Sequence, residues 1–149
     1  MDGGNHYKKV DDITVLRILP CTHLLSKNWD LFGHSWVELG EDESYGWWPA
    51  WPKNRFLFIG MLFGVPGDLN GQRILCGTPT KDPHHRDRSP GVIVYDLYCN
   101  DRRTAEEIKN QIRHSVQHHQ GAWRWPFGLC CHSFQQKMFK DLNLIVRRK

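Results

Sequence analysis

The chain has 149 residues, of which 40% are hydrophobic and seven are Trp, so it can build one sizeable core but is too short for two. A single domain is therefore expected over residues 1–149, with a flexible polar lead-in at residues 1–12. The formal net charge of +4 favours an anionic partner. Because the charges are scattered and no nucleic-acid-binding module is readable, a nucleic-acid partner is not expected.

The five cysteines, at positions 21, 76, 99, 130 and 131, show no paired C-x-x-C spacing. Neither a zinc site nor a disulfide framework is indicated, and no cofactor is expected. We expect synthesis in the cytoplasm, a reducing compartment, without a signal peptide, because no apolar segment of the kind that such a leader needs is present. No run of about eighteen apolar residues occurs, so no membrane span is predicted.

Apolar runs and alternating patterns predict four strands in the first half of the chain. They lie at residues 13–19, 33–39, 45–48 and 55–63. The acidic turn at residues 40–44 joins the second and third of these strands into a hairpin. Residues 21–32 show roughly helical spacing of apolar residues and are predicted to form a short helix or a packed loop.

A long surface excursion is predicted at residues 64–90, which hold eight Gly and Pro, with a short strand at residues 73–76. The clearest strand of the chain follows at residues 92–99. A capping box formed by Thr104 and Glu107 then predicts the start of an amphipathic helix.

That helix is predicted to end near His118, and a second helix and a short strand at residues 144–146 complete the chain. The order is strands, helix, helix and strand. It predicts an α+β fold in which helices pack on an antiparallel sheet.

The stretch at residues 123–140 carries the strongest chemical signal. An aromatic loop with Pro and Gly runs into an amphipathic helix that begins at Cys130 and Cys131, and a helix N-terminus lowers the pKa of a thiol. The unpaired N–H groups there can also bind an oxyanion. Cys131 shares the apolar stripe of the helix with Phe134 and Met138, which makes it the candidate nucleophile. The same pattern also fits a cysteine that only packs.

A thiol nucleophile needs an imidazole base, and His34 is the best placed of the nine histidines. It lies on a predicted strand beside a glycine, in an aromatic setting that can exclude water. Five others are predicted to lie at the surface: His84, His85, His114, His118 and His119. Taken by itself, His34 also fits a core histidine that is hydrogen-bonded to the backbone.

Two short motifs and the order of the elements resemble the circularly permuted papain-like superfamily. The motifs are G-H-S-W-V-E-L followed by Y-G-W-W-P, and C-H-S-F-Q at the start of the second helix. In that superfamily, which includes NlpC-type cell-wall peptidases and lecithin:retinol acyltransferase-like enzymes, the base His on a strand precedes the nucleophilic Cys on a helix. The resemblance implies that His34 is the general base and Cys131 the nucleophile. Many relatives have Asn where this chain has Cys130, and helical phase favours Cys131.

A third polar group that orients the imidazole is also expected. If residues 40–44 form the turn, His34 lies opposite Ala50 or its neighbours, where no such group is found. Glu38, on the same face as His34, is one candidate and Asp96 is another. A dyad whose ring is held by a backbone carbonyl is equally compatible with the sequence. Three aromatic residues are predicted to line a substrate groove: Trp36, Trp48 and Trp125.

The resemblance implies a monomeric cysteine amidase or peptidase that cleaves peptide amides in bacterial peptidoglycan. A small basic chain without a signal peptide further suggests an antibacterial effector, exported by a specialised system such as type VI secretion and matched by an immunity protein. With the same catalytic residues, the substrate could instead be a host protein, a ubiquitin-like tag or a lipid acyl group. From a different class, the chain could be a non-catalytic basic binding module whose Cys and His are structural.

Overall fold

The computed structural model describes residues 6–19, 33–50, 63–73, 75–124 and 130–149. The short helix or loop predicted at 21–32 lies outside the described residues, as does nearly all of the strand predicted at 55–63. Trp125, one of the three predicted groove residues, also lies outside them.

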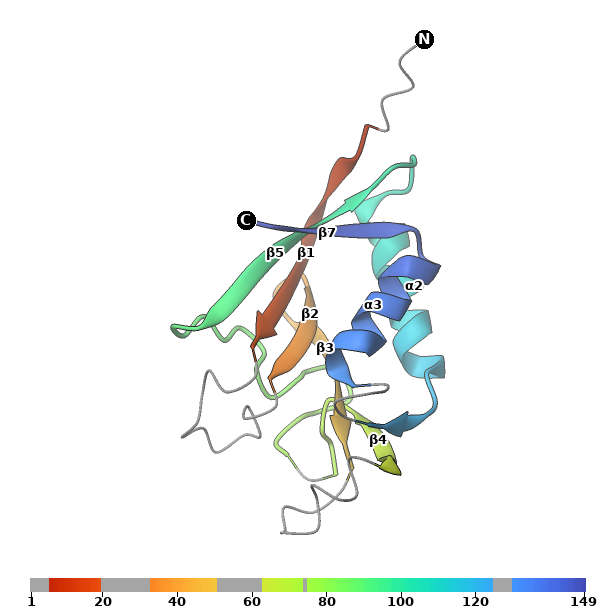
Figure 1. Ribbon diagram of the computed structural model, residues 1–149. Coiled ribbons are helices and arrows are strands. Elements are labelled where there is room, and N and C mark those ends of the chain that lie inside the picture. The colour runs from red at the N-terminus through yellow and green to blue at the C-terminus, as the bar shows by residue number, and fades with distance from the viewer. Residues whose placement is uncertain (1–5, 20–32, 51–62, 74, 125–129) are drawn as a thin grey trace.

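The described residues form a curled antiparallel sheet and two helices, so the predicted α+β class is confirmed. The elements are β1 (Lys8–Ile18), β2 (His34–Leu39), β3 (Glu43–Pro49), β4 (Val65–Leu69), β5 (Val92–Cys99), α2 (Ala105–His118), β6 (Ala122–Trp123), α3 (Cys131–Asp141) and β7 (Leu144–Arg148). The sheet has seven strands in the order β6-β4-β3-β2-β1-β5-β7. Both helices lie against the same face of this sheet (Figure 1).

Alternation along β1 and β2 sends side chains to two different layers. Val15 of β1 and Val37 of β2 face each other in the main core, which α2 and α3 cover. Leu16 and Trp36, one residue along each strand, form a second, small core on the opposite face. Because side chains on a strand alternate with a period of two, the side chain of His34 leaves β2 on the same face as Trp36.

The two helices begin where the sequence predicts. Thr104 caps α2, since its hydroxyl accepts the N–H of Glu107 while the Glu107 carboxylate accepts the N–H of Thr104. The apolar stripe of α2, at Ile108 and every fourth residue after it, is buried. α3 begins at Cys131 and buries its predicted stripe in the same core. Within the described ranges, no helix has the length and apolar character needed to cross a membrane.

The first strand is longer than predicted. Residues 8–12 were expected to belong to the flexible lead-in, but Lys8 and Lys9 pair with Cys99 and Tyr98 of β5. A bulge separates these pairs from those that begin at Thr14, and residue 12, within the bulge, has φ of 58°. A bulge interrupts the alternation of side chains, which is why the apolar pattern marked only the second part of the strand.

The short strand predicted at residues 73–76 is wrong, because the described residues there form a turn and bends. The strand of this region is β4, at Val65–Leu69, which contains Pro66 and Gly67. Both residue types are rare in strands, so the local signal was weak. Gly67 has a packing reason, since a Cβ on it would come within 2.0 Å of the Trp47 ring.

Candidate active site

His34, the first residue of β2, is enclosed by aromatic rings. Its exposed fraction is only 1%, and the Trp48 indole stacks on it with 3.8 Å between ring centroids. The Trp36 ring lies 5.6 Å away and nearly parallel to it. His84, which was predicted to lie at the surface, is instead buried, with its ring 5.4 Å from that of His34. This enclosure excludes water and fixes the plane of the imidazole.

The hairpin register explains why Trp48, and not Ala50, meets His34. Leu39 pairs with Glu43, and the register continues to the pair of Trp36 and Gly46. Two residues further along each strand, it places Trp48 opposite His34. The turn is therefore shorter than the predicted 40–44, because residues 43 and 44 already belong to β3.

The partner of the imidazole is Asp82, which lies in the long segment between β4 and β5. His34 Nε2 and Asp82 Oδ2 are 3.0 Å apart, and both side chains are buried. The indole N–H of Trp48 donates to the same oxygen at 2.7 Å, and the backbone N–H of His84 donates to the other oxygen at 2.9 Å. Burial raises the pKa of the Asp82 carboxyl, but the charge of His34 and these hydrogen bonds outweigh it, so the pKa lies below its usual value.

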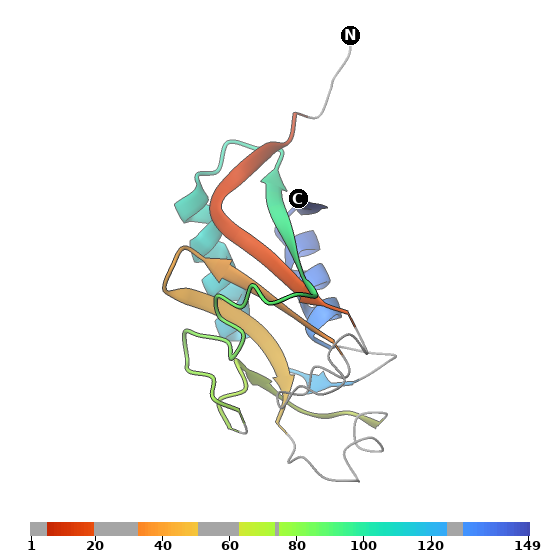
Figure 2. The same cartoon turned by 90° about the vertical axis from the view of Figure 1, so that its left-hand side faces the viewer.

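Asn70 ties the segment that carries Asp82 to strand β3. Its buried side chain accepts the N–H of Gly46 at 3.0 Å and donates to the carbonyls of Ser44 and Thr78 at 3.1 and 2.9 Å. The hydroxyl of Ser44 in turn accepts the backbone N–H of Asp82 at 2.9 Å. Figure 2 shows this segment crossing β2 and β3 on the face away from the helices. A network of this kind holds the carboxylate in one position relative to the imidazole.

Gly46 leaves the space in which the imidazole and the carboxylate meet. A Cβ at this position would lie 2.2 Å from Asp82 Oδ2 and 2.7 Å from His34 Nε2. Both distances are far shorter than van der Waals contact. Only glycine therefore fits at this point of β3 without displacing the pair.

Glu38 and Asp96, the two acids considered as partners of His34, make other contacts. The Glu38 carboxylate pairs with Arg88 at 2.6 Å. Burial raises its pKa, but the hydrogen bond from Arg88 and further hydrogen bonds bring the pKa below its usual value. Asp96 lies on β5 and pairs with two lysines of the sheet surface. The carboxylate in contact with the His34 ring is that of Asp82.

Trp36 and Trp48 do not line an open groove in this structure, because their exposed fractions are 0% and 2%. The indole N–H of Trp36 donates to Glu38 at 3.1 Å, and that of Trp48 donates to Asp82. Their observed contacts are with the residues around His34. The predicted substrate-lining role is thus replaced by one of holding the imidazole and its carboxylate.

Cys131 meets strand β2 on both sides of His34. Its Sγ lies 4.0 Å from the carbonyl oxygen of Gly33, and the backbone N–H of Ser35 is directed at the same sulfur. The Ser35 hydroxyl donates to the side chain of Gln135, and both residues are fully buried. This hydrogen bond fixes the first turns of α3 on β2. The structure therefore brings the thiol to the strand end that carries His34.

The two neighbouring thiols differ in acidity. The thiol of Cys131 donates a hydrogen bond to the sulfur of Cys130; together with hydrogen bonds from Ser133 and His132, and against the effect of burial, it lowers the pKa of Cys130 to about 5. The same hydrogen bond, followed by burial, raises the pKa of Cys131. Cys130 is therefore the thiol that ionises first. The apolar stripe did not reveal this, since it reports only which residues face the core.

We expect iodoacetamide to label Cys130 in the folded protein, with a rate that rises through about pH 5 as the thiolate forms. Cys131→Ala removes a hydrogen-bond donor to this sulfur and should shift the midpoint to higher pH. Cys130→Ala removes the neighbouring negative charge and should shift the Cys131 midpoint to lower pH. Mass spectrometry of digested, labelled protein measures both.

Cys99 is the internal control for this labelling experiment. Its thiol is buried under β5, with an exposed fraction of 1%, and should stay unlabelled until the protein unfolds. Equal labelling of all three cysteines only on unfolding would contradict the assigned acidity of Cys130.

No model of a protein family matches the chain, and neither curated proteins nor solved structures match it. The chemistry of the site is therefore argued from its own residues. These are an imidazole with a buried carboxylate on one side of β2, and two thiols at the start of a helix that contacts the same strand. In the described ranges, no group of three or more His, Cys, Asp or Glu is arranged to hold a metal ion.

Proposed function

We propose that this protein is a cysteine hydrolase of permuted papain-like type, with Cys131 as nucleophile, His34 as general base and Asp82 as the residue that orients the imidazole. The buried contact between His34 and Asp82, at the strand end that the Cys131 thiol reaches, carries the proposal. A histidine that only packs needs one backbone partner. A buried carboxylate that accepts three hydrogen bonds is costly to desolvate, and such pairs concentrate at functional sites.

In the proposed reaction, Asp82 accepts the Nε2 proton of His34, which favours the tautomer whose Nδ1 is basic. Nδ1 takes the proton of the Cys131 thiol, and the thiolate forms a C–S bond with the amide carbonyl carbon. N–H groups at the start of α3 stabilise the oxyanion. His34 returns the proton to the amide nitrogen as the C–N bond breaks, and water then hydrolyses the thioester with His34 again as base.

Cys130 is the second candidate for the nucleophile, favoured by its lowered pKa. If it attacks, the same imidazole protonates the leaving amine, and Cys131 serves as the hydrogen-bond donor that stabilises the thiolate. The reaction class and the products are unchanged.

The proposed substrate is a peptide amide of bacterial peptidoglycan. A net charge of +4 suits an anionic cell-wall polymer, and the motif resemblance points to cell-wall peptidases. The proposed setting is an effector exported by a specialised system such as type VI secretion, acting in a target cell, with an immunity protein in the producing cell. This setting rests on analogy with the family that the motifs resemble.

The purified protein is expected to release new amino groups from isolated peptidoglycan without new reducing sugar ends, because an amide and not a glycosidic bond is cleaved. Expression directed to the periplasm should lyse bacteria, whereas the same chain kept in the cytoplasm should be nearly harmless. The matched control is Cys131→Ala directed to the same compartment.

Intact muropeptides after long digestion, combined with toxicity confined to the cytoplasm, would replace the cell-wall substrate with a protein or acyl substrate of the same thiol. Unreactive thiols together with full toxicity of the Cys131→Ala and Cys130→Ala variants would assign the chain to the non-catalytic binding class.

A further inference from the structure

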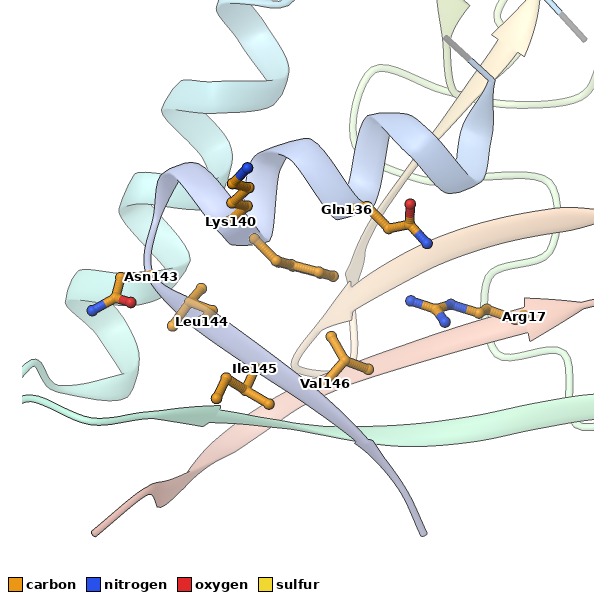
Figure 3. Close-up of a pocket in the computed structure, with 8 residues that line it drawn as sticks. Arg17, Gln136, Lys140, Asn143, Leu144, Ile145 and Val146 are labelled. Atoms are coloured by element: carbon orange, nitrogen blue, oxygen red, sulfur yellow. The ribbon is translucent and has the colours of Figure 1, made fainter. Parts of the chain in front are cut away.

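A cavity of about 380 Å³ lies between α3, β7 and the end of β1. Two cations, two amides and four apolar residues line it: Arg17, Lys140, Gln136, Asn143, Phe139, Leu144, Ile145 and Val146. Figure 3 shows the Arg17 guanidinium reaching from β1 toward Gln136 of α3 and Val146 of β7. The cavity thus combines a positively charged wall with an apolar wall.

No acidic residue is among the described residues that line this cavity. The Nε of Arg17 is buried and has no hydrogen-bond partner in the described part of the chain, while the guanidinium stacks over the Tyr95 ring at 4.7 Å. A planar guanidinium with an unused donor is suited to a carboxylate, which it can bind through two parallel hydrogen bonds. The stacking holds the guanidinium plane in place, so the cavity is prepared for an anion.

The cavity lies beside the proposed catalytic thiols. Arg17 pairs across the β1 and β2 strands with Ser35, whose backbone N–H is directed at the sulfur of Cys131. His132, in the first turn of α3, senses the charges of both Cys130 and Arg17. A ligand group in the cavity would therefore belong to the same molecule as an amide placed at the start of α3.

We propose that this cavity binds a free carboxylate of the substrate, with Arg17 as the main partner and Lys140 as the second, so that the enzyme selects acidic peptides. The inference rests on the proposed function and adds its specificity. The apolar wall, formed mainly by β7 and Phe139, accommodates the alkyl part of the residue that carries the carboxylate. The amides of Gln136 and Asn143 supply hydrogen-bonding groups for the peptide backbone.

Calorimetric binding to the full-length Cys131→Ala protein, which cannot turn over substrate, tests this inference. The probes are N-acetyl-L-alanyl-D-glutamate and the same peptide with both carboxylates converted to carboxamides. We expect the acid to bind at least about tenfold more tightly than the amide, as a charge-assisted pair predicts. Arg17→Gln should remove this difference, and Lys140→Gln should reduce it.

Lys137→Gln is the matched control, because it removes the same charge from α3 at an exposed position outside the cavity and should leave the difference unchanged. If Arg17→Gln does not fold, the exposed Lys140 provides the deciding variant. Equal binding of acid and amide, or an equal effect of Lys137→Gln, would overturn the inference. Displacement of the acid by inorganic phosphate at lower concentration would also overturn it, because the cavity would then prefer a phosphate group.

The result separates the two proposals. A persistent difference between acid and amide, in a chain whose wild type cleaves nothing, would leave the cavity as a binding site and remove the hydrolase. Hydrolysis by the wild type with no difference in binding would do the reverse.

Discussion

Cys131→Ala is expected to lower the rate of amide hydrolysis by about 10⁴-fold or more while the protein stays folded. The thiolate supplies the covalent step, and without it only binding and oxyanion stabilisation remain. Removing one sulfur from the start of a helix should lower the free energy of unfolding by at most a few kcal/mol. Release of amino groups measures the first effect, and a urea titration followed by circular dichroism measures the second.

His34→Gln should cause a similar loss of activity, because glutamine can still donate to Asp82 but cannot take the thiol proton. The double variant should be little worse than either single one, since the two groups act as a unit. Cys99→Ala serves as the control for loss of a thiol elsewhere in the core. If Cys130→Ala is inactive and Cys131→Ala is active, the nucleophile is Cys130 and the argument from helical phase is wrong.

Asp82→Ala is expected to be one of the most destabilising single substitutions, lowering the free energy of unfolding by about 3 to 5 kcal/mol. It leaves three buried donors without their acceptor: His34 Nε2, the Trp48 indole N–H and the His84 backbone N–H. Asp96→Ala is the matched control, because its surface pairs with lysines should be worth no more than about 1 kcal/mol. Similar losses for the two variants would remove Asp82 from the centre of the site.

Asp82→Asn keeps the shape of the side chain and tests its charge. Hydrolysis should fall by roughly 10²- to 10⁴-fold, because an amide no longer fixes the imidazole tautomer. Since the pKa of Asp82 is lowered in the folded protein, its carboxylate stabilises the fold at pH above the usual Asp value. That contribution is lost as the pH falls through the lowered pKa, so the stability of wild type and variant should converge in acid. A constant difference down to low pH would contradict the ionised pair.

Much of the fold follows from local patterns. The alternation at residues 33–39, the capping box at Thr104 and the apolar stripe after Cys131 each concern neighbours within one or two turns or pleats, and each element formed as predicted. β4 was missed because Pro66 and Gly67 are accepted there for their fit against Trp47, which is a tertiary contact.

The candidate site was less visible in the sequence for a related reason. His34 and Cys131 lie in motifs, whereas Asp82 is 48 residues from His34 and stands in a segment without periodicity. An error of two residues in the hairpin register was enough to place Ala50 opposite His34 and hide Trp48. Acidity at Cys130 depends on where a neighbouring S–H points, which no pattern of residue types encodes.

The contact between Cys131 and Gly33 joins residues 98 positions apart in the chain. During synthesis, β2 emerges from the ribosome long before the helix that carries the thiols. Closing so long a loop has an entropic cost that is recovered only when α3 packs on the sheet, so assembly of the site is among the late steps of folding. A nascent chain, or one that has lost its last twenty residues, holds the imidazole and the carboxylate but no nucleophile. The order of the elements thus delays any thiol chemistry until the whole chain has been made.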